Sequence, residues 1–541
     1  MGIGSKIGLS RVVRCFREPP AGLVGRIYGL GVDCLHSSTH LCLADQKAAL
    51  LEFKNTISLY GYCVQFISPR TNTYNESTDC CSWEGVSYNQ LTGHVNAVNL
   101  SGSCRYGSLP ANTSLFQLQG LQRLHLSDNN FNGSIPSELF RQLVSLTHLN
   151  LYHSGFSDLI PHEISLLSNL VSLDLSSYCF PASLRFDAQA FDMLARNLTK
   201  LRNLALQCVD MSGVAVTSFV NFSSSLGRLS LGDCQLHGQF PSEAFRLPYL
   251  QHVDLDWNQN LTGFLPKTYL SLALELLDLS FCSGSIPASF GNLTQITFLD
   301  FSENNFGGQI PDHKTVFRTS RLEVLDLSNN KITGRISKWE AEGANSLNFL
   351  NLQMPNPLLF LIIFFISENK LTGNIPSLIC NRTSLVVLDL SKNSLSGTIP
   401  ECLGNVSYGL QFLNLQMNNF YGEIPDSFMN NMLRNLLLND NQLEGSLPRS
   451  SANCSSLEVL NLGNNKLTDT FPHWLASLPR LQVLILRLNR LHGSLPNSIA
   501  SSDFSTLRII DLSGNELTGP LPTNLFQNLR AMKDVPKKPL S

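Results

Sequence analysis

The chain has 541 residues, of which 43% are hydrophobic and 15% are charged, a composition typical of folded proteins and unlike that of disordered ones. Its 38 basic and 41 acidic residues nearly balance. The sequence therefore has neither the excess of positive charge typical of nucleic-acid-binding proteins nor an acidic tail. The fourteen cysteines are dispersed along the chain, which excludes a small disulfide-stapled scaffold.

Residues 1–40 form an irregular lead-in that carries Lys6, Arg11 and Arg26 but lacks the run of about 7–15 apolar residues of a secretory signal. Its His36 and His40 lie near Cys34 and Cys42, but these residues lack the spacing of four zinc ligands, so we expect no metal site.

Residues 41–94 combine a short amphipathic helix with a cysteine-rich turn. The helix is predicted from Cys42 to Lys54, where apolar residues recur at helical spacing. The motif Asp79-Cys80-Cys81-Ser82-Trp83-Glu84-Gly85-Val86 follows it.

From residue 95 to 525 one frame, L-x-L-x-x-N-x-L-x-G-x-I-P, recurs at spacings of mostly 22–26 residues. About 18 copies are present, and their first aliphatic or aromatic positions are Val98, Leu124, Leu149, Leu173, Leu204, Leu229, Val253, Leu277, Leu299, Leu325, Leu350, Phe364, Leu388, Leu413, Leu436, Leu460, Leu484 and Ile510. This period is that of leucine-rich repeats, so we predict an α/β solenoid. The expected array is curved and superhelical, with a parallel concave sheet and a helical N-terminal cap.

Each position of the frame has a physical role. The two leucines of L-x-L point inward from a short strand, and the residue between them faces out. The asparagine can donate to and accept from backbone groups that lose their ladder partners where the chain turns. Cys234 and Cys282 occupy this asparagine position in their repeats.

The frame breaks twice. Residues 176–200 are long and irregular. The second break lies near 353–366 and contains the apolar run from Leu358 to Ile366. We interpret this break as a shortened repeat with a strand at Phe364-x-Ile366, and the alternative is a buried loop. The run is shorter than the ~17–25 residues that span a bilayer. A short tail, 526–541, ends the chain.

The G-x-I-P ending of a 24-residue unit resembles the plant extracellular class of leucine-rich repeats, over roughly four-fifths of the chain. The segment 41–94 is similar to the amino-terminal cap of plant leucine-rich-repeat receptors and polygalacturonase inhibitors. That resemblance implies a Cys42–Cys80 disulfide. The family has a further cap cysteine where this chain has Tyr88, so Cys81 lacks its expected partner, and Cys63 or Cys104 could substitute.

Cys380 and Cys402 follow Pro376 and Pro400 on neighbouring repeats. Stacked coils could bring them within the ~4.4–6.8 Å Cα separation of a disulfide, which we favour over two buried thiols.

Eleven Asn-x-Ser/Thr acceptors together favour a secretory route. They are Asn75, Asn99, Asn112, Asn132, Asn197, Asn221, Asn260, Asn292, Asn381, Asn405 and Asn453.

No arrangement of residues indicates catalysis or a cofactor. Aspartates recur at one repeat position, which predicts a solvated stripe and not an acid–base pair. The outward positions of the strands remain as a binding surface, because interfaces favour large and aromatic residues. In the amino-terminal half the candidates are His125, His148, Tyr152, His153, His252, Asp254, Asp256 and Trp257.

The cap and repeats resemble the ectodomain of plant receptor-like proteins, the group that includes the tomato leaf-mould resistance proteins. The resemblance implies a non-catalytic, extracellular ectodomain on a single-pass membrane anchor. It would bind a peptide or protein ligand, with no nucleic acid, and signal in defence or development through a co-receptor kinase. The sequence shows no anchor, so we interpret it as a truncated member whose membrane association would need a segment absent here. The alternative is a secreted polygalacturonase inhibitor, although those have about ten repeats.

Overall fold

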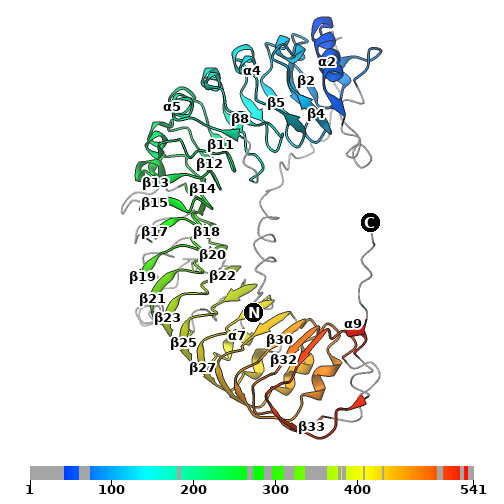
Figure 1. Cartoon of the computed structure of the whole chain (residues 1–541), viewed down its shortest axis with the longest axis vertical. Coiled ribbons are helices and arrows are strands. Elements are labelled where there is room, and N and C mark those ends of the chain that lie inside the picture. The colour runs from blue at the N-terminus through cyan, green and yellow to red at the C-terminus, as the bar shows by residue number, and fades with distance from the viewer. Residues whose placement is uncertain are drawn as a thin grey trace, which may run out of the picture.

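The computed structural model describes residues 42–59, 74–179, 184–264, 271, 273–285, 295–309, 322–335, 362–375, 379, 385–405, 409–428, 432–495, 504–523 and 529–533. They form a single curved solenoid, and its short coils succeed one another along an arc (Figure 1). Among these residues no helix has both the length and the apolar character needed to cross a bilayer.

The inner wall of the arc is a sheet of short parallel strands, one per coil, which we call the concave sheet. Its parallel strands are β3 (Val95–Asn99), β5 (Arg123–His125), β7 (His148–Asn150), β9 (Ser172–Asp174), β11 (Asn203–Ala205), β12 (Arg228–Ser230), β14 (His252–Asp254), β16 (Leu276–Asp278), β18 (Phe298–Asp300), β20 (Val324–Asp326), β22 (Ile363–Phe365), β24 (Val387–Asp389), β26 (Phe412–Asn414), β28 (Asn435–Leu437), β30 (Val459–Asn461), β32 (Val483–Ile485) and β34 (Ile509–Asp511). β2 (Val86–Tyr88) from the cap pairs antiparallel with β3.

The register repeats from coil to coil: Leu124 pairs with Leu149, and Leu460 with Leu484. The first inward side chain of each strand is buried from Val98 to Leu484, and Ile510 on the last strand is partly buried. The predicted leucine-rich-repeat solenoid is therefore confirmed.

One predicted coil is wrong. The repeat counted at Leu350 lies outside the described residues, yet β20 pairs directly with β22, with Leu325 opposite Phe364. The concave sheet thus has no place for a strand between them, and the eighteen counted positions reduce to seventeen. The spacing of fourteen residues from Leu350 to Phe364 is too short for a coil of about 24. The strand at Phe364 itself is present, and Phe364 and Ile366 are buried.

Beside the concave sheet, further short strands follow the asparagine corner of many coils. These flanking strands are β4 (Arg105–Ser108), β6 (Asn130–Asn132), β8 (Asp158–Leu159), β10 (Leu184–Arg185), β13 (His237–Gln239), β15 (Asn260–Phe264), β17 (Ser283–Ser285), β19 (Gly307–Gln309), β21 (Lys331–Arg335), β23 (Lys370–Gly373), β25 (Ser394–Gly397), β27 (Asn419–Gly422), β29 (Gln442–Gly445), β31 (Lys466–Leu467), β33 (His492–Ser494) and β35 (Glu516–Thr518). Glycines here adopt the left-handed conformation that the tight passage requires, as Gly397 does at φ 93°.

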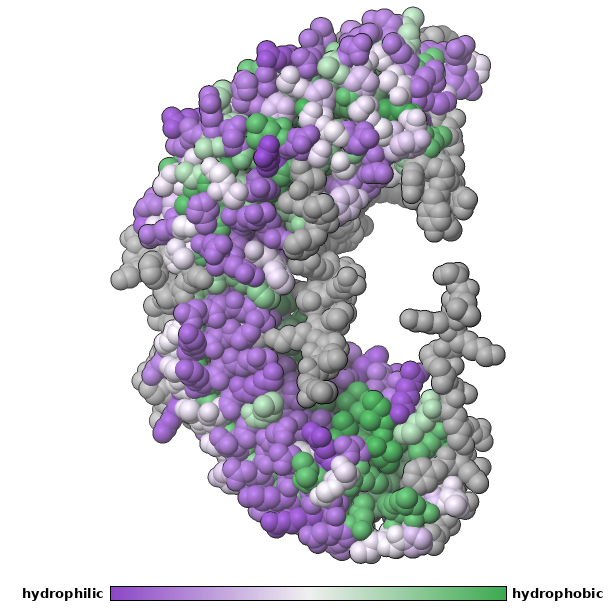
Figure 2. Space-filling model, viewed as in Figure 1, coloured by the Kyte–Doolittle hydropathy of each residue, from purple (hydrophilic) through white to green (hydrophobic). Residues whose placement is uncertain are grey.

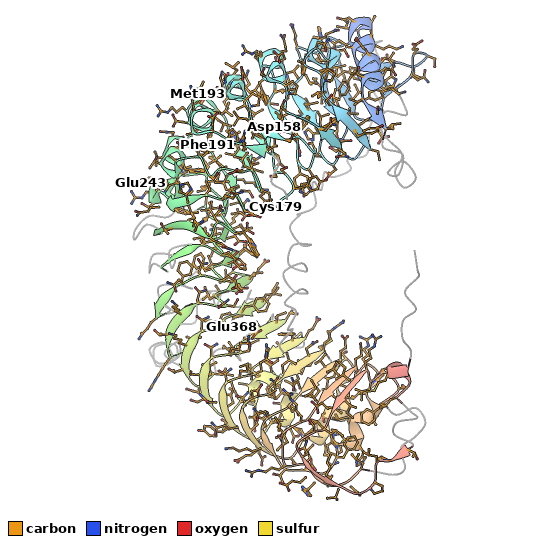
Figure 3. The ribbon with its side chains drawn as sticks, viewed as in Figure 1. Asp158, Cys179, Phe191, Met193, Glu243 and Glu368 are labelled. Carbon is orange, nitrogen blue, oxygen red and sulfur yellow. A yellow bond between two sulfur atoms is a disulfide. The ribbon has the colours of Figure 1, made fainter. Side chains whose placement is uncertain are left out.

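Helical turns cover the outer side of the arc, where Phe191, Met193 and Glu243 lie (Figure 3). The α-helices beyond the cap are α4 (Ser137–Gln142), α5 (Ala188–Asn197), α7 (Cys402–Asn405) and α9 (Arg530–Lys533). The 3₁₀ turns of the coils are η3 (Ser114–Gln117), η4 (His162–Leu166), η5 (Val216–Asn221), η6 (Ser242–Arg246), η10 (Asp426–Phe428), η11 (Arg449–Asn453) and η12 (His473–Ser477).

The predicted cap helix is α2 (Ala44–Thr56), and its apolar face covers the first coil. Ala49, Leu50 and Phe53 are buried, at the i, i+1 and i+4 positions of one helix face. β1 (Ser58–Leu59) then pairs with β4, and η2 (Cys80–Ser82) follows. The cap thereby shields the end of the hydrophobic core, as a terminal coil requires.

The asparagine corner satisfies backbone groups as the frame predicts. The Nδ2 group of Asn258 donates to the carbonyls of Leu231, Leu255 and Asp256 at 2.9–3.1 Å. Its Oδ1 accepts from the backbone N–H of Leu236 in the preceding coil, at 2.9 Å.

The two cysteines in the asparagine column use their thiols in the same way. Cys234 Sγ contacts the Leu206 carbonyl oxygen at 3.0 Å, and Cys282 Sγ contacts that of Leu255 at 3.2 Å. The corner therefore accepts a small donor side chain wherever one replaces asparagine.

The cysteines differ in part from expectation. Cys42 and Cys80 form a disulfide, the pair implied by the cap. Cys81 carries a free thiol and Cys104 is disulfide-bonded, whereas Cys63 lies outside the described residues. Cys402 is disulfide-bonded, while Cys380 lies outside the described residues.

A disulfide that we did not predict joins Cys179, in the irregular segment 176–200, to Cys208 on the following coil. It joins the inner wall of one coil to the next, and α5 fills the extra length on the outer side (Figure 3).

Candidate ligand-binding surface

The candidate surface is the solvent side of the concave sheet together with the corner residues beside it. In the described coils other than that of β9, the residue before the asparagine position has a left-handed backbone: φ is 54° at Asp128, 58° at Trp257 and 55° at Phe281. This repeated conformation turns the corner side chains out of the core, in a column beside the strands.

The structure places the predicted residues in two groups. His125 and His148 lie on the neighbouring strands β5 and β7, with Tyr152 and His153 at the corner of the second coil. His252 and Asp254 lie on β14, with Asp256 and Trp257 at its corner. The strands β9, β11 and β12 separate the groups, by roughly 19 Å at ~4.8 Å per strand.

The first group contains a stack of aromatic rings. The centroid of the His153 ring lies 3.8 Å from that of Tyr152 and 4.5 Å from that of Tyr178 on the next coil. Tyr178 is 49% exposed. Sequence reasoning missed Tyr178 because it falls in the irregular segment, where the frame assigns no position.

The second group contains a similar pair. The Trp257 ring stacks on Phe281 at 3.9 Å, and Trp257 is 43% exposed. Phe281 occupies the same repeat position as Trp257, 24 residues later, so the period itself could have identified it. Stacked rings expose their edges and hydroxyl groups while fixing their positions, which suits contact with a protein or peptide.

Two histidines of the surface, His125 and His252, have lowered pKa values, which favours the neutral form of their rings. Burial, and then Arg228, lowers the pKa of His252 to about 4. Burial, and then His148 and Arg123, lowers the pKa of His125. Their ring nitrogens can therefore accept or donate hydrogen bonds without adding positive charge.

The aspartate column forms the solvated stripe that the period suggested only in part, because most of its members are partly exposed but two are not. Asp254 and Asp278 are buried, because neighbouring polar groups and coils enclose them. Asp254 accepts from Gln207 Nε2 at 2.8 Å and from Ser230 Oγ at 3.2 Å. Oxygens of Asp254, Asp256 and Asp278 lie within 4.8 Å of one another, a spacing that could accommodate a hard cation.

Glycan acceptors lie mostly away from the concave sheet. Among the described residues Asn75, Asn112, Asn132, Asn197, Asn260 and Asn453 are exposed and lie in the cap, the flanking strands or the outer turns. Asn99 lies on β3, Asn221 donates to Asp192 Oδ1 at 3.0 Å, and Asn405 lies in α7. Asn292 and Asn381 lie outside the described residues.

Comparison with protein families identifies the modules. Residues 43–87 match the leucine rich repeat N-terminal domain, and residues 116–177 and 431–491 match the leucine rich repeat. Further leucine rich repeat matches cover 321–339, 384–406, 409–431 and 506–528.

Among solved structures, the chain is similar to the ectodomain of the Arabidopsis receptor kinase HAESA in complex with an extended IDA peptide hormone. The TM-score is 0.72 at 26% identity, over 90% of this chain and 80% of that one. It is also similar to the plant peptide hormone receptor RGFR1 in complex with RGF2, with a TM-score of 0.61 at 25% identity over 83% and 86%.

Curated relatives are plant receptor-like proteins. The chain is 39% identical to Receptor-like protein 6 of Arabidopsis thaliana and 37% identical to Receptor-like protein Cf-9 of Solanum pimpinellifolium. Each match covers 48% of this chain but only 27% and 31% of the relatives' own lengths. Receptor-like protein 54 of Arabidopsis thaliana is 33% identical over 90% of this chain and 67% of that protein. The chain therefore belongs to the leucine-rich-repeat receptor-like proteins of plants.

Proposed function

We propose that this chain is a non-catalytic ligand-recognition ectodomain, which binds a peptide or protein on the solvent side of the concave sheet. We further propose that it acts outside the cell at the plasma membrane, in defence or developmental signalling through a partner receptor kinase. The solved neighbours support this proposal, since HAESA was solved with the hormone IDA and the co-receptor SERK1.

The observation that carries the proposal is the pair of aromatic groups on the concave side. Tyr152 and Trp257 are held by stacking against His153 and Phe281, so each is ordered before a partner arrives. A preordered aromatic side chain loses little conformational entropy on binding, which is the property of binding hot spots. The exposed glycan acceptors leave most of this wall uncovered.

The test is quantitative capture of extracellular partners by the secreted, tagged chain. Wild type is compared with the double variant Tyr152→Ala, Trp257→Ala, and with Tyr249→Ala as a matched control. Tyr249 is 67% exposed and lies outside the strands of the concave sheet. We expect partners of the wild type to be retained by Tyr249→Ala and to lose at least tenfold in affinity for the double variant.

If the double variant captured the same partners with unchanged affinity, the choice of surface would be wrong. Inhibition of a fungal polygalacturonase by the purified chain would instead support the inhibitor alternative.

A further inference from the structure

Two lines of side chains run in register along the concave sheet from β18 to β26. The first position of each strand is apolar: Phe298, Val324, Ile363, Val387 and Phe412. All five are partly exposed. We call this set the apolar line.

The third position of the same strands is mostly acidic, with Asp300, Asp326 and Asp389, which we call the acidic line. All three are partly exposed. Phe365 interrupts the line on β22 and Asn414 ends it on β26. Positions one and three of a strand lie on the same face about 6.6 Å apart, so the two lines run side by side along the arc.

Within the described ranges no Lys or Arg side chain forms an ion pair with the aspartates of the acidic line. Lys392, at the corner beside β24, is already paired with Glu368 at 2.8 Å. Each aspartate accepts the backbone N–H two residues ahead, as Asp300 does from Ser302 at 2.9 Å. Burial, and then the neighbouring Asp326, raises the pKa of Asp300 to about 8. A cation placed along this line would relieve the repulsion between the carboxylates.

We propose that the apolar and acidic lines together bind an extended peptide segment in which basic and apolar residues alternate. This rests on the proposed function and names the ligand class for it. A chain running along the arc between the lines would point successive side chains alternately at one line and the other, because a strand alternates its faces. Five strands span four steps of ~4.8 Å, or roughly 19 Å, which an extended segment covers with about six residues.

The proposed peptide differs from other basic ligands in its extended length and in the alternation of its basic and apolar side chains. A helix would present its side chains at i, i+3 and i+4, and a block of positive charge would leave the apolar line without a contact. This peptide class is proposed because its basic side chains complement the acidic line while its apolar side chains contact the apolar line.

The experiment measures binding of labelled eight-residue peptides to the whole secreted chain by fluorescence anisotropy at low salt and at pH 9, where the carboxyl group of Asp300 is ionised. The probe alternates Lys with Val and Phe, and its counterpart has the same composition with the lysines in one block. The protein variants are Asp300→Asn with Asp326→Asn, and Phe412→Ala. The matched control, Glu243→Gln with Glu401→Gln, removes the same charge away from the concave sheet.

We expect the alternating peptide to bind at least tenfold more tightly than the block peptide. The aspartate pair variant should weaken its binding at least tenfold and Phe412→Ala at least fivefold, while the control stays within twofold. Equal binding of both peptides, equal weakening by the control pair, or no binding would overturn the inference. If the peptide fails while the Tyr152 and Trp257 variants still lose natural partners, the inference falls and the proposed function stands.

Discussion

The replacement Asn258→Ala tests the asparagine corner, the device that turns each coil. The side chain is fully buried, and its amide makes four hydrogen bonds, to Leu231, Leu255, Asp256 and Leu236. Each hydrogen bond contributes about 1 kcal/mol net, and a buried group left without a partner costs at least as much. The expected loss in the free energy of unfolding is therefore about 3–5 kcal/mol.

Urea unfolding of the purified chain, followed by circular dichroism, measures this loss. Native-state hydrogen exchange adds a local readout, because the backbone N–H of Leu236 loses its acceptor and should exchange faster. Asn169→Ala is the control: its Nδ2 donates to the Val144 carbonyl at 3.4 Å and its Oδ1 accepts from Lys200 Nζ at 2.8 Å. Both hydrogen bonds are exposed, so their loss should cost less than about 1 kcal/mol.

A loss below about 1 kcal/mol for Asn258→Ala, with unchanged exchange at Leu236, would refute the role given to this position.

Two further predictions concern the disulfide and the buried carboxylates. Cys179→Ser opens a loop of 29 residues and should lower the free energy of unfolding by about 3–4 kcal/mol in non-reducing urea titrations, whereas Cys81→Ser, at a free thiol, should leave it unchanged. The pKa of Asp300 is raised from 3.8 to about 8, so the folded chain keeps a proton that the unfolded chain releases near pH 4. Stability should then fall as the pH rises from about 4 to 8. Asp300→Asn should raise the Tm at pH 8 by about 2 °C or more and leave it unchanged at pH 4, and an equal shift at both pH values would contradict this origin.

The periodic part of the fold could be predicted from the sequence because every coil uses the same arrangement of core and corner residues. The inward pair and the corner amide recur every two dozen residues, so Leu124 and Leu460 could be assigned to strands without reference to the rest of the chain. The same reasoning failed where the period fails. The strand at Leu350 was counted because its letters fit, although fourteen residues cannot close a coil before Phe364.

The chemistry of the surface was harder to predict than the fold. Outward positions follow from alternation, but their exposure depends on neighbours several coils away. Asp254 was expected to be solvated and is buried, because Gln207 from two coils back reaches its carboxylate. The Cys179–Cys208 disulfide and the exposed ring of Tyr178 were missed, since an irregular segment gives no frame for pairing distant residues.

The central claim is that recognition takes place on the solvent side of the concave sheet. Hydroxyl-radical footprinting of the secreted chain, alone and with a captured partner, tests it most directly by measuring the oxidation of individual side chains. We predict that Tyr152, Tyr178 and Trp257 are protected by the partner while Tyr249 is oxidised at the same rate in both states. Protection of Tyr249 with unchanged oxidation of Tyr152 and Trp257 would contradict the claim.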